Sequence, residues 1–173
     1  MIIKEYDRNA VFTYAKRWAF ARNTKYYNFN ALGGDCTNFA SQCVFAGSQV
    51  QNYIPVYGWF YKSLNDRTAS WTGVEYFYNF LIGNGKSSES GEGIGNGAGP
   101  FAIEVSGSEI EVGDIIQLGR ANGDFYHSPV VVGFSNGVPL IAAHTYDAFM
   151  RPITSYRFER IRYIHILGVR AEE

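Results

Sequence analysis

The sequence predicts an α+β fold, with helices in the first half of the chain and a mostly antiparallel sheet in the second. Apolar residues recur at helical spacing up to about residue 82, whereas from Phe101 onward they form short runs separated by turn residues. This order is typical of helices that pack on an antiparallel sheet. The sequence contains no internal repeat, and its 173 residues fit one domain spanning 1–173.

Three helices are expected before residue 83. The first spans about 8–22, where Val11, Ala15 and Trp18 recur on one face. The second spans about 36–46 with a continuous apolar stripe, and Gly47 is suited to end it. The third spans about 71–82 and also has an apolar face.

Five strands are expected after residue 100. They are placed at about 102–105, 115–118, 128–134, 140–144 and 163–169. Asn136-Gly137 is a strong signal for a tight hairpin turn between the third and fourth strands. Between the helices and the strands, residues 83–100 contain seven glycines, which predicts a flexible loop and a candidate lid for the site.

The composition argues against several classes of partner. With 15 basic and 16 acidic residues the net charge is −1, so the chain lacks the basic footprint of a nucleic-acid-binding protein. No apolar run approaches the roughly 20 residues of a membrane span, and no signal peptide is visible at the N-terminus. We therefore expect either an intracellular protein or a mature domain from a longer exported chain.

The segment Gly33-Gly34-Asp35-Cys36 is the most informative part of the sequence. The two glycines permit a tight turn. Asp35 can cap a helix and stabilise it by about 1 kcal/mol, and Cys36 then lies in the first helical turn. The helix dipole there favours a thiolate, although the charge of Asp35 opposes it. His127, at the start of a predicted strand, is the candidate general base and acid. These residues predict a cysteine-nucleophile hydrolase of amide bonds.

Other chemistries are disfavoured. Cys36 and Cys43 would lie about 10.5 Å apart along one helix, beyond the roughly 7 Å limit for a disulfide, so both thiols should be free. The three histidines are scattered and neither HExxH nor CxxC occurs, so no metal site is expected. No cofactor is expected either. His165 is interpreted as a structural residue of the last strand.

Three segments resemble the NlpC/P60 peptidoglycan peptidases. Asp35-Cys36-Thr37-Asn38-Phe39 is similar to their Asp-Cys-Ser-Gly-Leu signature, Val112 to Ile116 to their Pro-Gly-Asp-Leu-Val segment, and His127 to Gly133 to their His-Val-Gly-Ile-Tyr-Leu-Gly segment. The chain resembles more closely the "putative amidase domain" family of that superfamily, in Tyr6-Asp7-Arg8-Asn9-Ala10, in Gly33-Gly34-Asp35-Cys36-Thr37-Asn38-Phe39 through Ser41-Gln42, and in His144-Thr145-Tyr146-Asp147. The resemblance implies a papain-like fold with the nucleophile helix packed on the sheet.

The resemblance also implies roles for individual residues. Cys36 would be the nucleophile and His127 its base, with His144 or Asp147 as the orienting third member. The Cys36 N–H is one oxyanion donor. In papain-like sites a Gln six residues before the Cys supplies another, and here that position is Asn30, with Asn28 and Tyr27 as alternatives.

The expected function is hydrolysis of an amide or peptide bond through acylation of Cys36. The resemblance points to bacterial peptidoglycan as the substrate, and so to a location outside the cytoplasm if the chain is an excised domain. Two alternatives stay open: acyl transfer to an amine, and a non-catalytic module that binds cell wall or protein on the same scaffold.

Overall fold

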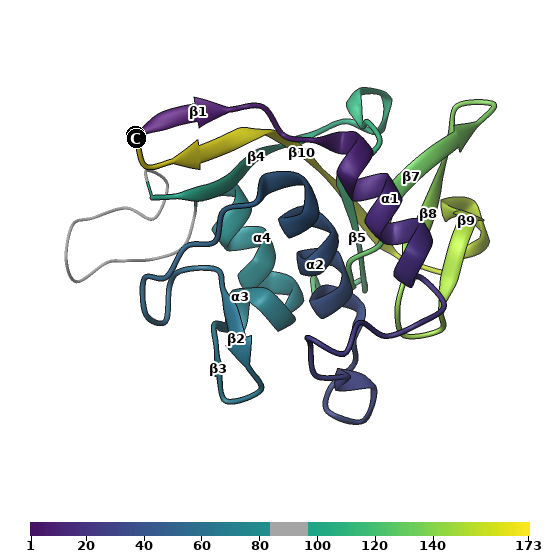
Figure 1. Ribbon diagram of the computed structural model, residues 1–173. Helices are drawn as coiled ribbons and strands as arrows, with labels where there is room; N and C mark the ends of the chain where they lie inside the picture. Colours follow the sequence, from purple (N-terminus) through teal and green to yellow (C-terminus); the bar gives the residue numbers. More distant parts are fainter. Residues whose placement is uncertain (84–96) are drawn as a thin grey trace.

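An antiparallel eight-stranded sheet forms the centre of the computed structural model, which describes residues 1–83 and 97–173 (Figure 1). Its strands follow the order β1-β10-β5-β7-β8-β9, with β4 also paired to β10 and β6 to β5. Their bounds are β1 Ile2–Lys4, β4 Gly99–Val105, β5 Ile115–Gly119, β6 Phe125–His127, β7 Val130–Ser135, β8 Val138–Ala143, β9 Ala148–Pro152 and β10 Arg160–Ala171. The long strand β10 joins the N-terminal strand β1 to the rest of the sheet.

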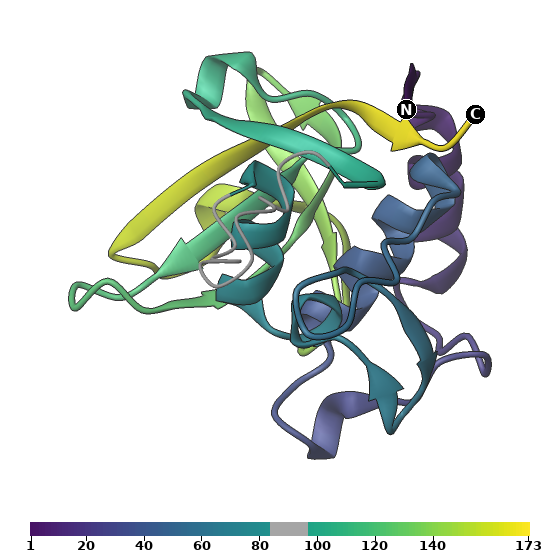
Figure 2. The ribbon, with the colours of Figure 1, turned by 90° about the vertical axis from the view of Figure 1, so that its left-hand side faces the viewer.

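The helices precede most of the sheet in the sequence, so the α+β prediction is confirmed. The α-helices are α1 Arg8–Trp18, α2 Cys36–Ser48, α3 Ala69–Thr72 and α4 Val74–Ile82. Short 3-10 turns occur at η1 Phe29–Ala31, η3 Gly107–Glu109 and η4 Ile153–Ser155, and a small hairpin is formed by β2 Tyr61–Ser63 and β3 Asp66–Arg67. Figure 2 shows α1 and α2 side by side, next to the curled sheet.

Apolar residues of adjacent sequence positions enter two different cores, one on each face of the sheet. Ile115 belongs to the cluster that includes the buried helix residues, whereas Ile116 belongs to a second, smaller cluster that also contains Ile153. Such alternation follows from the two-residue repeat of a strand. The first cluster buries α2 almost completely and thereby fixes the position of Cys36.

Local sequence signals explain several element boundaries. The Asp7 side chain accepts a hydrogen bond from Ala10 N at 2.9 Å and caps α1. Asn136 and Gly137 have φ angles of +49° and +78°, which confirms the predicted tight turn between β7 and β8.

Some predicted elements differ from the structure. The helix expected to reach residue 22 ends at Trp18, whose carbonyl accepts a hydrogen bond from His144 Nε2 at 2.7 Å instead of continuing the helix. The helix expected over 71–82 is divided at Gly73, which is extended. His127 does not open β7 but ends β6, because Pro129 separates these two strands. Strands β1, β2, β3, β6 and β9 were not predicted.

Most of the predicted glycine-rich loop, residues 84–96, lies outside the described residues. Its two ends are described: Gly83 terminates α4 with a φ of +75°, and Gly99 begins β4. Over residues 1–83 and 97–173, no helix combines the length and apolar character needed to cross a bilayer.

Candidate active site at the start of helix α2

Cys36 is the first residue of α2 and lies where the helix meets the β6–β7 junction. Gly33 and Gly34 precede it with φ angles of +87° and +102°, the left-handed conformation that glycine adopts readily. Cys36 is 8% exposed, and its Sγ lies 3.8 Å from the carbonyl oxygen of Tyr126 and 3.7 Å from Thr37 Oγ1. The nucleophile candidate therefore touches the residue that precedes His127.

Burial controls the protonation of this thiol. Loss of solvent raises the pKa of Cys36 above its ordinary value, and the nearby Asp35 charge adds to that effect. Hydrogen bonds from Thr37 and from the Ser128 backbone lower the pKa in part. In this conformation desolvation therefore opposes the thiolate that the helix dipole favours.

His127 is also buried, at 7% exposure, and it directly follows Tyr126 at the end of β6. Its ring lies 5.5 Å from that of Tyr156, and its Nε2 has no hydrogen-bond partner among the described residues. Burial, with a smaller effect of Arg151, lowers the pKa of His127 to about 4. Within residues 1–83 and 97–173 no hydrogen bond joins this ring to Cys36, so the structure brings the two segments together without linking the two side chains.

His144 occupies a different place from the one expected for a residue that orients His127. It follows β8 directly, and its ring stacks on Phe39 of α2 with a centroid distance of 4.0 Å. Its Nδ1 lies 2.5 Å from Asp35 Oδ2, and its Nε2 donates to the Trp18 carbonyl. Both ring nitrogens are therefore engaged at the start of α2 and the end of α1.

Asp35 occupies the N-cap position of α2, but its side chain does not cap the helix, contrary to the prediction. Its Oδ1 instead accepts hydrogen bonds from Phe29 N at 2.8 Å and Asn38 Nδ2 at 2.9 Å, while Oδ2 faces His144. Burial opposes the carboxylate charge, but these hydrogen bonds, led by that of His144, hold the pKa of Asp35 below its usual range. The Asp35 side chain is buried.

Arg22 connects this buried pair to the surface, a role that the sequence did not indicate. Its guanidinium forms two hydrogen bonds to Asp147, of 3.0 and 2.9 Å, and its Nε lies 3.6 Å from Asp35 Oδ2. Asp147, the alternative third member, is thus paired with Arg22. An arginine at the end of an expected helix gives no sequence signal for such a contact.

The candidate oxyanion residues lie on the turn before α2. Asn30, Asn28 and Tyr27 are all exposed, and Asn28 Oδ1 accepts a hydrogen bond from Asn30 N at 3.0 Å. The Tyr27 carbonyl accepts one from Asn38 Nδ2 at 3.0 Å. Asn38 was not predicted as a site residue, yet its buried amide holds this turn against α2.

A second polar cluster joins two of the motif segments away from Cys36. Arg8 Nη1 lies 2.7 Å from Asp114 Oδ1, and His165 Nδ1 lies 2.7 Å from Asp114 Oδ2. Glu111, Asp114 and His165 could present three ligand atoms to a metal ion. However, Arg8 already supplies a positive charge to Asp114 and to Glu111, which lies 3.5 Å from it.

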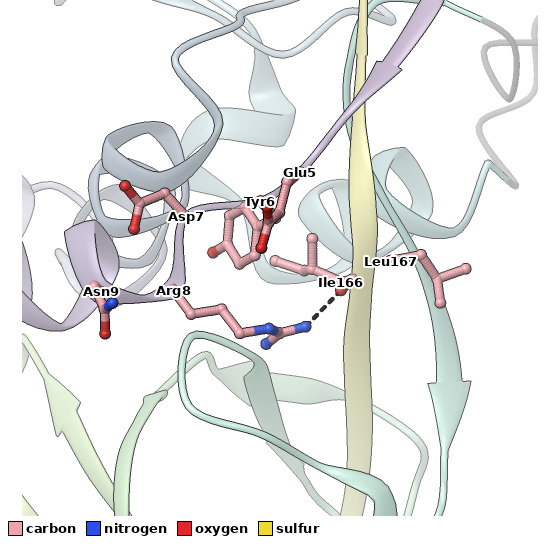
Figure 3. Close-up of a pocket in the computed structure, with 7 residues that line it drawn as sticks. All are labelled: Glu5, Tyr6, Asp7, Arg8, Asn9, Ile166 and Leu167. Atoms are coloured by element: carbon pink, nitrogen blue, oxygen red, sulfur yellow. Dashed lines mark hydrogen bonds between the residues drawn. The ribbon is translucent and has the colours of Figure 1, made fainter.

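Next to this cluster lies a cavity of about 480 Å³ between the start of α1 and β10. Figure 3 shows that the Arg8 guanidinium reaches across it to the Ile166 carbonyl, at 2.7 Å. Arg8 also donates to the Val112 carbonyl. None of the candidate catalytic residues lines this cavity. We therefore interpret the Arg8 contacts as structural: they hold the start of α1 against β10 and against the segment that precedes β5.

Comparison with known proteins identifies the family. Residues 5–167 match the family described as "putative amidase domain". The chain belongs to this amidase-domain family. A relative, the "uncharacterized protein YhbB" of Bacillus subtilis (strain 168), is 34% identical over 152 residues, which cover 85% of this chain and 44% of that protein. The chain thus spans less than half of the length of this relative. No solved structure matches the chain.

Proposed function

We propose that this amidase-domain protein hydrolyses an amide or peptide bond through a thioester on Cys36, on a papain-like scaffold related to that of the NlpC/P60 peptidases. One observation carries the proposal: Cys36 Sγ lies at the start of α2, 3.8 Å from the carbonyl of Tyr126, the residue next to His127. A helix N-terminus with a cysteine beside a strand-borne histidine provides the groups that acyl transfer needs. Membership in the amidase family supports the same class of reaction.

The proposed mechanism starts from two neutral groups. Because burial raises the pKa of Cys36 and lowers that of His127, the resting pair is a thiol and an imidazole and not an ion pair. His127 takes the Sγ proton as sulfur attacks the substrate carbonyl, and then gives this proton to the leaving amine. A water molecule, deprotonated by His127, next cleaves the thioester and releases the acid. Because Nε2 of His127 has no hydrogen-bond partner among residues 1–83 and 97–173, it is the ring nitrogen proposed for these transfers.

The remaining residues hold the site together in this proposal. The Cys36 N–H and the exposed Asn30 side chain are the proposed donors to the oxyanion. The pair of Asp35 and His144 has a structural role in this proposal. Through the Asp35 carboxylate and the Trp18 carbonyl, His144 holds the start of α2 and the end of α1 next to β8. His144 is thus a positioning residue, with Arg22 and Asp147 closing the same arrangement from the surface.

For the substrate, we propose peptide stems of bacterial peptidoglycan or the amide that joins them to sugar. The support is the similarity of the Cys36, Val112–Ile116 and His127 segments to those of peptidoglycan peptidases. This substrate implies action outside the cytoplasm, in the cell wall.

Digestion of purified peptidoglycan, followed by mass spectrometry of the soluble fragments, tests the proposal. The wild-type protein should release fragments with new free carboxyl and amino ends, and the Cys36→Ala and His127→Ala variants should release none. An active Cys36→Ala variant would overturn the nucleophile assignment. If the wild type only binds the polymer, the protein is a binding module, whereas amine adducts formed with added hydroxylamine or glycine amide would identify an acyl transferase.

A further inference from the structure

A chain of buried polar side chains leads from Cys36 to a buried cation on β10. Thr37 Oγ1, 3.7 Å from Cys36 Sγ, donates to Ser128 Oγ at 3.3 Å. Ser128 Oγ also accepts a hydrogen bond from Gln117 Nε2 at 3.0 Å, and Gln117 Oε1 accepts from Arg162 Nε and Nη2 at 2.9 and 2.6 Å. Gln117 is fully buried, and neither Thr37 nor Ser128 is more than 1% exposed.

Arg162 is an unusual residue in this position because it is only 8% exposed. Its guanidinium lies between the rings of Tyr78 and Phe125, 3.5 and 3.8 Å from their centroids. Its carboxylate partner, Glu75 at 2.9 Å, is itself largely exposed. Such a burial of positive charge is expensive unless the hydrogen bonds that it makes are in place, and here two of them go to Gln117.

These bonds determine which way the Gln117 amide faces. A guanidinium can only donate, so the amide oxygen must point toward Arg162. The amide NH₂ is then directed toward Ser128 Oγ and the Val74 carbonyl, each at 3.0 Å. Ser128 receives hydrogen bonds from β5 and from α2 at once, and it follows His127 directly. The orientation of one amide thus links β10 to the junction that carries the proposed base.

We propose that Arg162 is a positioning residue for the Cys36 site: it fixes the Gln117 amide, which holds Ser128 and the adjoining His127 against the first turn of α2. The inference rests on the proposed role of Cys36 and adds to it a group on another element that acts through contacts.

The charges around the thiol give the expected direction of the effect. Asp35 opposes ionisation of Cys36 from the start of α2, the neutral His127 adds no charge from β6, and the backbone N–H groups of Thr37 and Ser128 donate to sulfur. Arg162 of β10 is the cation at the far end of the hydrogen-bond chain that reaches Ser128 and Thr37. Its counter-ion is Glu75 of α4. Removal of Arg162 frees the Gln117 amide and loosens these donors, which disfavours the thiolate.

The test measures the rate of alkylation of Cys36 by iodoacetamide as a function of pH in the full chain. Mass spectrometry of the Cys36 peptide separates this thiol from Cys43. The Arg162→Gln variant should show a midpoint about one pH unit higher, with roughly tenfold slower alkylation below it. Arg162→Lys, which keeps the charge but loses the paired donors, should fall between this variant and the wild type.

Arg160→Gln is the matched control, since Arg160 lies two residues earlier on the same strand and is exposed, and in the described part of the chain its guanidinium bonds only to the Ala121 carbonyl. Its profile should equal that of the wild type. A folded Arg162→Gln protein with the wild-type midpoint would overturn the inference. If Arg162→Gln does not fold, Gln117→Glu keeps an acceptor for Arg162 but loses the donor to Ser128. This variant should show the same upward shift, and an unchanged midpoint would overturn the inference equally.

Alkylation requires no hydrolysis, so the two proposals fail separately. An active Cys36→Ala variant would remove the proposed nucleophile but leave the effect of Arg162 on the thiol measurable. Conversely, an inactive Cys36→Ala variant together with an unchanged Arg162→Gln midpoint would leave the nucleophile and remove the positioning residue.

Discussion

At the scale of single residues, the loop after His144 holds an unusual backbone conformation. Thr145 and Tyr146 have φ angles of +61° and +60°, a region that costs a non-glycine residue about 1–3 kcal/mol. The neighbours of Tyr146 are anchored: Thr145 Oγ1 accepts a hydrogen bond from Asp35 N at 2.9 Å, and Asp147 is held by Arg22. Tyr146 itself is 87% exposed. The hydrogen bonds of Thr145 and Asp147 therefore hold the Tyr146 backbone in a strained conformation, although the Tyr146 side chain contributes little packing.

We expect the Tyr146→Gly variant to be more stable than the wild type. Glycine removes the conformational strain, and this gain should exceed its larger loss of backbone entropy by roughly 0.5 kcal/mol. Urea denaturation would measure the change. Phe20→Gly is the control, because Phe20 is 69% exposed but is not among the residues with positive φ, so its replacement should lower stability. A loss of stability in Tyr146→Gly would contradict the assignment of strain.

The buried pair of Asp35 and His144 gives a second prediction at this scale. Asp35→Asn removes the charge that faces His144 and leaves the imidazole without its carboxylate, so we expect a loss of about 3–5 kcal/mol in unfolding free energy. Asp147→Asn breaks only the partly exposed pair with Arg22 and should lose about 1 kcal/mol or less. Equal effects of the two variants, measured by chemical denaturation, would argue against a special role of the buried pair.

At the scale of elements, the contact between α1 and α2 depends on a glycine. A Cβ added to Gly47 would lie 2.6 Å from Val11 Cγ2 and 2.8 Å from the Asp7 carbonyl oxygen. Alanine favours a helix over glycine by about 1 kcal/mol, but this overlap should reverse the sign, so Gly47→Ala is expected to destabilise by about 1–3 kcal/mol. A thermal melt that shows stabilisation would mean that the helices separate easily.

The elements also show what the sequence could predict. The spacing of apolar residues located α2 and five strands of the sheet, β4, β5, β7, β8 and β10. Asn136-Gly137 defined its hairpin because few residues adopt positive φ at two successive positions. Strand β1 was missed because it pairs with β10 across nearly the entire chain length, and its three residues are exposed. No local pattern encodes such a pairing.

The candidate site likewise has features that the sequence could predict and features that it could not. The position of Cys36 follows from local signals, namely two glycines, an aspartate and an apolar helix. The partners of His144 do not, since Trp18 contributes a backbone carbonyl that any residue could supply. Likewise Arg22 and Arg162 act through contacts made only after the chain has folded. The sequence therefore predicted the position of the candidate nucleophile better than the groups that surround it.

At the scale of the whole molecule, the buried titratable groups of the site should control stability in acid. The pKa of His127 is about 4 in the folded protein, compared with about 6.5 for an ordinary histidine. Between these two pH values the imidazole binds a proton in the unfolded chain but stays neutral in the folded protein. The resulting stabilisation is complete above about pH 6.5 and is lost as the pH falls toward 4. It amounts to about 3 kcal/mol. Asp35, whose pKa is also lowered, loses its contribution at still lower pH.

Comparison of wild type with His127→Gln tests this ordering. The neutral glutamine does not titrate, so the difference between the two unfolding free energies should be constant above pH 6.5 and should shift by about 3 kcal/mol in favour of the variant between pH 6.5 and 4. Below pH 4 the two curves should again run in parallel, since both proteins keep the pair of Asp35 and His144. Curves that are parallel throughout would show that the imidazole is accessible to protons in the folded state. In that case the resting site could form an ion pair with Cys36, and the neutral starting point of the proposed mechanism would have to be abandoned.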